Sequence, residues 1–407
     1  MPSRWRRIAV LGFLTVLADG FDTNALTFVV PKMAKEWGLK SSAFTPALVA
    51  THVGVVIGYV LLGRLVNRFG RKPVIISGTT IFAVGSALTV LADSIAVLTV
   101  LRLFTALGLG VVLPASISLA TDHAPQGRRE SVGVMVVIGI AIGNMVAGGA
   151  GVKLIAAYGW TAIFWLGAAL PALLLPLLIW GLPRTAPVPS GVGAAAGQSG
   201  SGEKAATVGR LFQGGLAVPT ALLWSFAFLV FMSGYALSTW IPTLLNTSFG
   251  FSEEQAPMGT VALGVGGVLG SLALIPLSTR VRTVLLVAGG ALIGSAFVTV
   301  TALSGAVGTV LLVLLAIGSS GTVPGVLGQA AVAVGLYPAS ARTTGVAWAA
   351  AIGRVGSIVG PAVIGALLAA DVSGRDVLLI AAVPMAAAAV VAVLLARRTA
   401  SAAEPQD

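Results

Sequence analysis

The stretch Ala18-Asp19-Gly20-Phe21-Asp22 lies in the middle of the first long apolar segment, residues 8–31. A helix that spans a bilayer needs about 20 mostly apolar residues, so both aspartates are expected near the bilayer midplane. They are three residues apart and share one helical face. A charge at that depth costs roughly 2.5–3.5 kcal/mol on insertion scales, so intramembrane acids usually serve a function. The structural alternative is that Asp22 caps a helix or hydrogen-bonds a neighbouring one.

The composition is that of a polytopic membrane protein. Of 407 residues, 57% are hydrophobic and only 9% are charged, and the mean hydropathy is +1.00. The formal net charge is +11, but Lys and Arg are dispersed between apolar segments and form no dense basic run. Nucleic acid is therefore not an expected partner. The chain has no cysteine, which excludes disulfides and thiolate metal sites.

About 12 segments are long and apolar enough to span a membrane. Their predicted limits are 8–31, 45–66, 73–93, 96–122, 131–153, 160–181, 216–246, 256–278, 282–303, 306–336, 341–369 and 376–397. The Pro-, Gly- and Ser-containing residues 183–214 between the halves indicate a flexible linker. We therefore expect an all-α integral membrane protein with 12 transmembrane helices in two pseudo-symmetric six-helix bundles. Its predicted parts are an N-terminal bundle, a cytoplasmic linker, a C-terminal bundle and a cytoplasmic tail, over residues 1–182, 183–214, 215–398 and 399–407.

The basic residues predict the orientation of the chain. Loops on one side carry most of the Lys and Arg, and the positive-inside rule then puts both termini in the cytoplasm. The expected location is the plasma (inner) membrane, with the lipid bilayer as a partner. Trp160 and Trp240 lie near segment ends and are predicted to be interface anchors.

The two halves repeat. Three residues recur with a constant offset of 213: Pro125, Arg129 and Gly143 return as Pro338, Arg342 and Gly356. Two six-helix halves related by a parallel repeat are a known transporter plan, with the substrate site between them at the midplane. The alternative is chance similarity between helices rich in Gly and Ala. Such glycines also predict close helix packing.

The loop after the second segment reads Gly63-Arg64-Leu65-Val66-Asn67-Arg68-Phe69-Gly70-Arg71-Lys72. It resembles the major facilitator superfamily signature G-x-L-x-D-R-x-G-R-K. Three further stretches narrow the match: Asp19 to Asp22, Arg102 to Gly110 with Pro114, and Tyr337 to Pro361. Together they resemble the aromatic acid:proton symporter family, over nearly the whole chain apart from the linker and tails.

The resemblance implies import of a benzoate-type or hydroxybenzoate-type anion with protons, by alternating access, without a cofactor or metal. It implies that Asp19 and Asp22 couple protons, and that Arg102 and Arg354 are the family's arginines of helices four and eleven. Gating is assigned to Gly63, Asn67, Arg68, Gly70, Arg71, Arg129 and Arg342. The family has aspartate where this chain has Asn67, so gating and coupling are expected to differ here. The expected oligomeric state is a monomer.

The four intramembrane charges sum to zero, because Asp19 and Asp22 oppose Arg102 and Arg354. An entering carboxylate would add a negative charge, which disfavours an ionised acid, so substrate and proton are expected to bind together. Arg354 is the first candidate for binding the substrate carboxylate and Arg102 is the second, since guanidinium binds carboxylate in a two-pronged pair. The alternative for Arg354 is a salt bridge with the first segment, and for Arg102 it is gating.

Four other side chains are candidates for contact with the substrate. Trp348 could stack on an aromatic ring or simply pack, and Tyr235 could line the cavity. Asn144 and Gln329 could bind a ring hydroxyl, but polar side chains inside spans also join neighbouring helices.

Two other transport functions remain open on the same fold. One is a proton-driven exporter of drugs or metabolites, although Asn144 replaces the usual proline of the exporter motif. The other is an importer of a non-aromatic organic anion. No phosphate-binding Gly loop occurs, which disfavours a nucleotide-driven pump. The sequence also lacks a nucleophile–base set and a sizeable soluble domain, so an enzyme or a sensor is not expected.

Overall fold

The computed structural model describes residues 2–183 and 208–401, and these residues are helical with short connections. Twelve of the helical segments are long and apolar enough to cross a membrane. The α-helices are α1 (Pro2–Thr23), α2 (Ala25–Trp37), α3 (Thr45–Phe69), α4 (Arg71–Thr89), α5 (Ile95–His123), α6 (Arg129–Tyr158), α7 (Thr161–Gly181), α8 (Ala217–Ser248), α9 (Met258–Ser278), α10 (Thr283–Leu303), α11 (Gly308–Leu336), α12 (Ala339–Ala369) and α13 (Gly374–Ser401). Three short 3-10 helices are η1 (Ser41–Phe44), η2 (Gln126–Arg128) and η3 (Val208–Phe212). The all-α class with 12 spans is confirmed.

The first span is longer than predicted and contains an interruption. Asn24, with φ −103° and ψ 3°, separates α1 from α2, and α2 continues to Trp37 instead of ending near residue 31. The prediction ended the span where Lys32 and Lys35 begin. These charges are compensated by ion pairs, and the intervening Met33 is fully buried. The helix can therefore continue through them.

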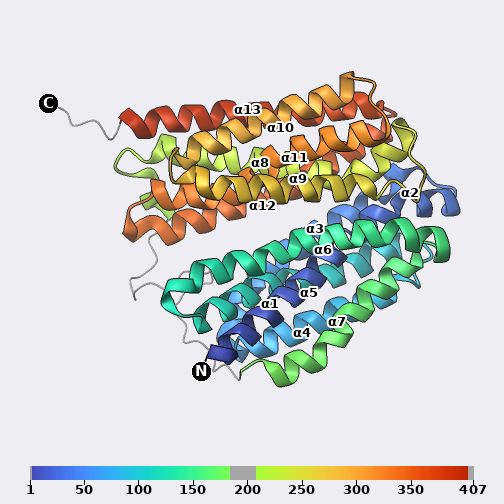
Figure 1. Cartoon of the computed structure of the whole chain (residues 1–407), viewed down its shortest axis with the longest axis horizontal. Coiled ribbons are helices and arrows are strands. Elements are labelled where there is room, and N and C mark those ends of the chain that lie inside the picture. Colours follow the sequence, from blue (N-terminus) through green and yellow to red (C-terminus); the bar gives the residue numbers. More distant parts are fainter. Residues whose placement is uncertain (1, 184–207, 402–407) are drawn as a thin grey trace. The chain divides into compact units, whose positions relative to one another are not determined.

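Contacts divide the chain into two compact units (Figure 1). Among the described residues, unit 1 comprises 2–183 together with Phe251–Val261, and unit 2 comprises 208–250 and 262–401. Residues 184–207 of the predicted linker and 402–407 of the predicted tail lie outside the described residues. The end of the predicted linker forms η3, in which Leu211 is fully buried.

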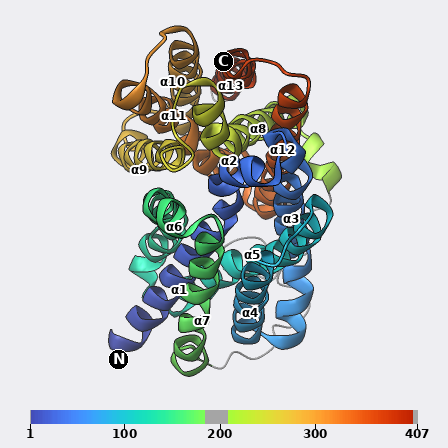
Figure 2. The same cartoon turned by 90° about the vertical axis from the view of Figure 1, so that its right-hand side faces the viewer.

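Each unit has the same internal arrangement of helices. In unit 1, α1 packs on α5 and α6, and α4 packs on α5 and α7; in unit 2, α8 packs on α11 and α12, and α10 packs on α11 and α13 (Figure 2). The recurring glycines occupy equivalent places. A Cβ atom on Gly143 would strike the carbonyl oxygen of Leu17 in α1, and one on Gly356 would strike that of Phe228 in α8. The repeat is therefore a repeat of helix packing.

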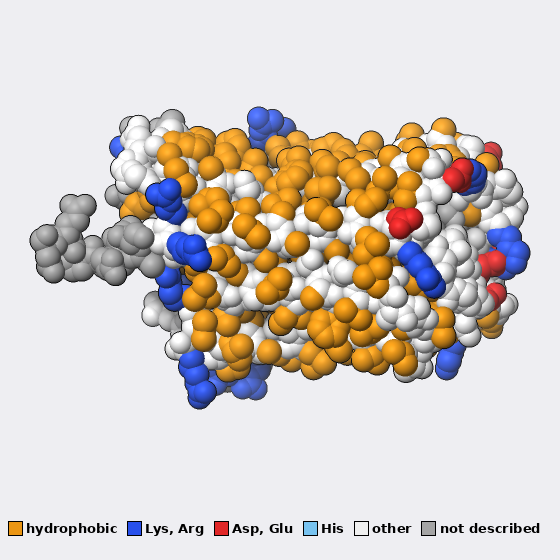
Figure 3. Space-filling model, turned by 90° about the horizontal axis from the view of Figure 1, so that it is seen from above, with side chains coloured by type: hydrophobic (Ala, Val, Ile, Leu, Met, Phe, Trp, Pro, Cys, Tyr) orange, Lys and Arg blue, Asp and Glu red, His pale blue; other side chains and the backbone are white. Residues whose placement is uncertain are grey.

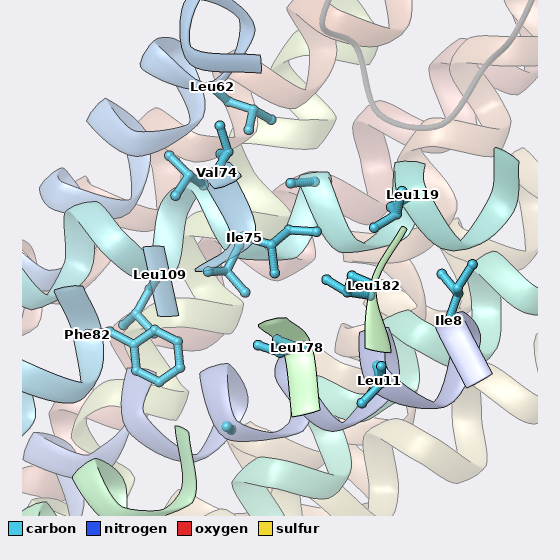
Figure 4. Packing of buried hydrophobic residues seen from close by; sticks show 14 residues of the cluster. Ile8, Leu11, Leu62, Val74, Ile75, Phe82, Leu109, Leu119, Leu178 and Leu182 are labelled. Carbon is cyan, nitrogen blue, oxygen red and sulfur yellow. The ribbon is translucent and has the colours of Figure 1, made fainter. Parts of the chain in front are cut away.

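Figure 4 shows the apolar core of unit 1, to which side chains from five helices contribute. Its labelled members are Ile8, Leu11, Leu62, Val74, Ile75, Phe82, Leu109, Leu119, Leu178 and Leu182. Inside a bilayer the lipid is as apolar as leucine, so such a core holds helices together by close van der Waals packing. The apolar surface of the displayed face in Figure 3 is suited to lipid, and most Lys and Arg side chains in view lie toward the helix ends.

Two tryptophans predicted to anchor the chain at the membrane interface lie inside the units instead. Trp160 is 8% exposed and packs edge-on against Trp37 and Phe164. Trp240 is fully buried, and its Nε1 donates to the carbonyl oxygen of Pro361 at 2.9 Å. A buried indole needs an acceptor for its N–H, and this carbonyl supplies it. The interface prediction for both residues is wrong.

Candidate functional site

The carboxylate of Asp22 joins three helices of unit 1. Arg102 of α5 donates from Nη2 to Asp22 Oδ2 at 2.9 Å and to the Asp22 carbonyl oxygen at 3.2 Å. Ser86 of α4 donates from its hydroxyl to Asp22 Oδ1. The side chains of Asp22 and Arg102 are both fully buried. A buried ion pair survives only when both charges are compensated and hydrogen-bonded, and here each is the other's counter-charge.

Helix α7 also lies against the Asp22–Arg102 ion pair. A Cβ atom on Gly167 would lie 3.1 Å from Asp22 Oδ1, so glycine leaves room for the carboxylate. The guanidinium carbon of Arg102 lies 5.6 Å from the ring centroid of Phe164, within the range of a cation–π contact. Nε and Nη1 of Arg102 have no hydrogen-bond partner among the described residues.

Asp19 and Asn144 lie on the same helix pair, α1 and α6. Asp19 is 6% exposed, and its Oδ1 accepts a hydrogen bond from Thr23 Oγ1 at 3.0 Å. Asn24, at the interruption between α1 and α2, donates from Nδ2 to Asn144 Oδ1 at 2.7 Å. Asn144 thus links α6 to the connection between α1 and α2. Such a link between neighbouring helices is the alternative to substrate binding that the sequence left open for Asn144. The sequence did not single out Asn24 or Ser86; a polar side chain within an apolar segment was the only signal for either residue.

Arg354 of unit 2 lies beside two aromatic rings. Its Nη1 donates to Tyr235 Oη at 3.2 Å, and its guanidinium carbon lies 5.8 Å from the ring centroid of Phe231. The rings of Phe231 and Tyr235 are stacked, with centroids 5.8 Å apart and an angle of 21°. A Cβ atom on Gly353 would lie 2.9 Å from the Phe231 ring, so glycine lets this ring lie against α12. Helices α8 and α12 thereby present a cation next to an aromatic pair, which we call the Arg354 cluster (Phe231, Tyr235, Arg354).

The other two substrate candidates of unit 2 differ in their surroundings. Trp348 stacks on Trp224 of α8, with centroids 5.7 Å apart and an angle of 22°, so this ring contact is packing between helices. Gln329 is 4% exposed, and its Oε1 has no hydrogen-bond partner within the described part of the chain. A buried acceptor without a donor is costly, so Gln329 is the better candidate for a polar contact with a ligand.

The loop signature contains an ion pair that the sequence did not predict. Arg71 donates from Nη1 to Asp122 Oδ2, at the end of α5. The negative partner of the basic loop is therefore supplied by Asp122 rather than by the signature position, where Asn67 stands. The guanidinium of Arg68 lies over the ring of Phe69, 5.1 Å from its centroid. The only sequence signal for Asp122 was an acid at the end of a neighbouring segment.

The same loop also binds the end of α7. Lys72 donates from Nζ to the carbonyl oxygens of Ile179 at 2.6 Å and Leu182 at 2.8 Å. A cation there satisfies carbonyls that have no partner inside the helix. Gly70 has φ +82°, and its N–H donates to the Val66 carbonyl at 2.8 Å. This left-handed conformation favours glycine at the corner between α3 and α4.

The remaining gating candidates lie in helices near the loops. Gly63 is in α3, Arg129 is the first residue of α6, and Arg342 is in the first turn of α12. The Nε atoms of Arg129 and Arg342 are buried and have no hydrogen-bond partner among residues 2–183 and 208–401. The two repeated arginines thus share their position in the repeat and a buried Nε atom.

Comparison with known proteins agrees with this architecture. The family model described as Major Facilitator Superfamily matches residues 12–334. The chain belongs to the major facilitator superfamily. It is 31% identical to the 4-hydroxybenzoate transporter PcaK of Pseudomonas putida over 88% of this chain and 84% of the relative. It is 32% identical to the gallate transporter of Pseudomonas putida over 89% of this chain and 85% of the relative.

The fold of this superfamily member also resembles a solved structure. A bacterial homolog of the human lysosomal transporter Spinster superposes with a TM-score of 0.74 at 16% identity, covering all of both chains. The likeness at this identity concerns the fold alone. The family match, the named relatives and the 12 candidate spans together make the chain a multi-pass membrane transporter of the superfamily and not an enzyme.

Proposed function

We propose that this chain is a secondary transporter that imports an aromatic carboxylate of the benzoate or hydroxybenzoate kind together with protons. The observation that carries the proposal is the Arg354 cluster, in which a guanidinium lies beside two stacked rings. Two relatives at 31% and 32% identity are named as transporters of 4-hydroxybenzoate and gallate, which are aromatic carboxylates. The direction of transport and the coupling to protons are part of the proposal.

The Arg354 cluster suits both parts of such a substrate. The planar guanidinium can hold a carboxylate through two parallel hydrogen bonds. Tyr235 fixes one guanidinium nitrogen and offers a hydroxyl next to the carboxylate position. A substrate ring can then stack at the usual 4.5–7 Å from the ring of Phe231 or Tyr235. Gln329 Oε1 is our candidate acceptor for a ring hydroxyl, with Trp348 and Asn144 as further candidates from the sequence.

We assign proton coupling to Asp19 and Asp22. An incoming anion adds negative charge, which favours proton uptake by a nearby carboxylate. Protonation of Asp22 would remove the counter-charge of Arg102, whose guanidinium would then be free to take another acceptor. We therefore assign Arg102 to the counter-ion of Asp22 rather than to first contact with the substrate. A proton moving across 100 mV supplies about 2.3 kcal/mol.

Topology and gating complete the proposal. Both termini lie in the cytoplasm, the chain is a monomer in the plasma (inner) membrane, and the loop signature lies at the cytoplasmic side. There the Arg71–Asp122 pair holds α4 to α5, in a unit where Asn67 brings no charge. Gly63, Arg68, Gly70, Arg129 and Arg342 complete the assigned gate.

The test is uptake of radiolabelled benzoate, 4-hydroxybenzoate, protocatechuate and gentisate by cells with and without this chain. We expect uptake of at least one acid, and loss of that uptake with a protonophore. The variant Arg354→Lys keeps the positive charge but loses the two parallel N–H donors of the guanidinium. Its KM for the labelled acid should therefore rise at least tenfold. Arg375→Lys is the matched control, since Arg375 is exposed, and it should match the unchanged chain.

Four outcomes would contradict parts of this proposal. Uptake of none of the acids would refute the substrate class, and net efflux of a loaded acid would indicate an exporter. Uptake that survives the protonophore would refute proton coupling. Equal KM values for Arg354→Lys and Arg375→Lys would remove Arg354 from the substrate site.

A further inference from the structure

The segment Phe251–Val261 belongs to unit 1 although the chain on both sides of it belongs to unit 2. It connects α8 to α9 and contributes the first turn of α9. Within it, Phe251 is 8% exposed, Ala256 is fully buried and Thr260 is 4% exposed. A mere connection would be expected to lie on the surface. In this segment, which we call the strap, these three side chains are instead buried, while Ser252, Gln255 and Met258 are exposed.

One carboxylate fastens the strap to the end of α2. Glu253 Oε1 lies 2.7 Å from Lys35 Nζ, and Glu253 Oε2 lies 3.5 Å from Lys32 Nζ. The side chain of Glu253 is only 13% exposed. The Lys35 side chain is 72% exposed and the Lys32 side chain is 25% exposed, so the carboxylate is the buried partner in both ion pairs. Glu253 therefore binds the strap to two lysines of unit 1.

Two glycines of α6 form a seat for the strap. A Cβ atom on Gly148 would lie 2.8 Å from Val261 Cγ2 and 3.1 Å from the Pro257 carbonyl oxygen. A Cβ atom on Gly151 would lie 3.4 Å from Pro257 Cβ. Gly149 lies between them, and a Cβ atom there would meet nothing within 4 Å. A side chain at Gly148 or Gly151 would therefore press against the strap, whereas a side chain at Gly149 would not.

We propose that the strap is a releasable latch, seated on α2 and α6 in one state of the transport cycle and lifted in another, with Glu253 and Lys35 as its fastening. Transporters of this fold work by movement of one half against the other. A segment seated on unit 1 but continuous with unit 2 at both ends must bend or lift when the units move. Gly250, with φ +75°, directly precedes the strap and provides a flexible corner. The inference rests on membership of the superfamily and not on the substrate.

The first test measures release of the latch without any substrate. The chain lacks cysteine, so Ala256→Cys introduces a single thiol that is buried while the latch is seated. Its labelling by a maleimide is followed in membrane vesicles of the full chain, alone and combined with Glu253→Gln, Gly148→Ala or Gly149→Ala. We expect labelling several-fold to tenfold faster with Glu253→Gln and with Gly148→Ala, and no change with Gly149→Ala. Equal labelling rates in all four proteins would overturn the proposal.

The second test pins the latch covalently. The spacing of 3.4 Å from a Gly151 Cβ to Pro257 Cβ is close to the 3.5–4.5 Å of a disulfide, so Gly151→Cys with Pro257→Cys should cross-link on oxidation. The oxidised double variant should lose uptake of the labelled acid and regain it with a reductant, while each single variant keeps uptake. Uptake by the oxidised protein at the rate of the reduced one would refute release of the latch. If the unchanged chain takes up none of the acids, the substrate proposal fails, and the maleimide labelling alone decides the latch.

Discussion

Replacing Asp22 by Asn keeps the shape of the side chain and removes the counter-charge of Arg102. Both side chains are fully buried, and the oxygen–nitrogen distance is 2.9 Å. Removal of one partner from a buried ion pair typically costs 3–5 kcal/mol, because the other charge stays buried without compensation. A loss of 3 kcal/mol lowers the equilibrium constant for folding more than a hundredfold. The additional variant Arg102→Gln in the same chain removes the stranded charge and should recover most of that loss.

The assay is equilibrium unfolding of the purified protein in mixed micelles, followed by tryptophan fluorescence. The internal comparison is Asp122→Asn, whose partner Arg71 is 23% exposed and which is itself 32% exposed. Partly hydrated pairs contribute about 0.2–1 kcal/mol, so this variant should cost no more than that. The reasoning is refuted if Asp22→Asn costs as little as Asp122→Asn, or if Asp22→Asn with Arg102→Gln costs the sum of the two single variants.

Two further predictions concern packing and burial. Gly143→Ala should destabilise the protein by about 1–3 kcal/mol in the same unfolding assay, because the added Cβ strikes the Leu17 carbonyl, whereas Gly149→Ala should have no effect. Burial raises the pKa of Tyr337, whose hydroxyl donates to Thr220 Oγ1 at 3.1 Å. A raised pKa in the folded state means that this stabilisation is complete below the ordinary value of 10.0 and is lost as the pH rises through the folded value. The melting temperature should therefore fall at high pH, and Tyr337→Phe should weaken that fall.

The fold followed from the sequence because membrane spans depend on length and hydropathy alone. The same holds for the repeat, since Gly143 and Gly356 must be small wherever two backbones approach closely. The interruption at Asn24 did not follow, because the long apolar segment of residues 8–31 continues past it. The extension to Trp37 also did not follow, since the partner that neutralises Lys35 is Glu253, more than 200 residues away.

For the candidate site, the sequence suggested a set of residues but not a set of contacts. Hydropathy marks Asp22, Arg102 and Arg354 as costly in a membrane, which identifies them without saying which pair with which. The sequence offered Arg354 as a possible partner of the first segment, whereas Asp22 pairs with Arg102 inside unit 1. The choice depends on how α5 packs against α1, and periodicity does not encode that. Trp240 was misplaced for the same reason, since its acceptor on α12 is visible only in three dimensions.

The helix pair α1–α6 of unit 1 and its equivalent α8–α12 of unit 2 share their glycine packing but differ in their polar residues. Both pairs carry a polar contact within a turn of the repeated glycine: Asn24 with Asn144 beside Gly143, and Tyr235 with Arg354 beside Gly356. The packing needs only the glycines, so the polar residues at these places are free to differ. In unit 1 they are two neutral amides that satisfy each other. In unit 2 they are a cation and a phenol, and under the proposed function this place, unlike its counterpart in unit 1, binds the substrate carboxylate.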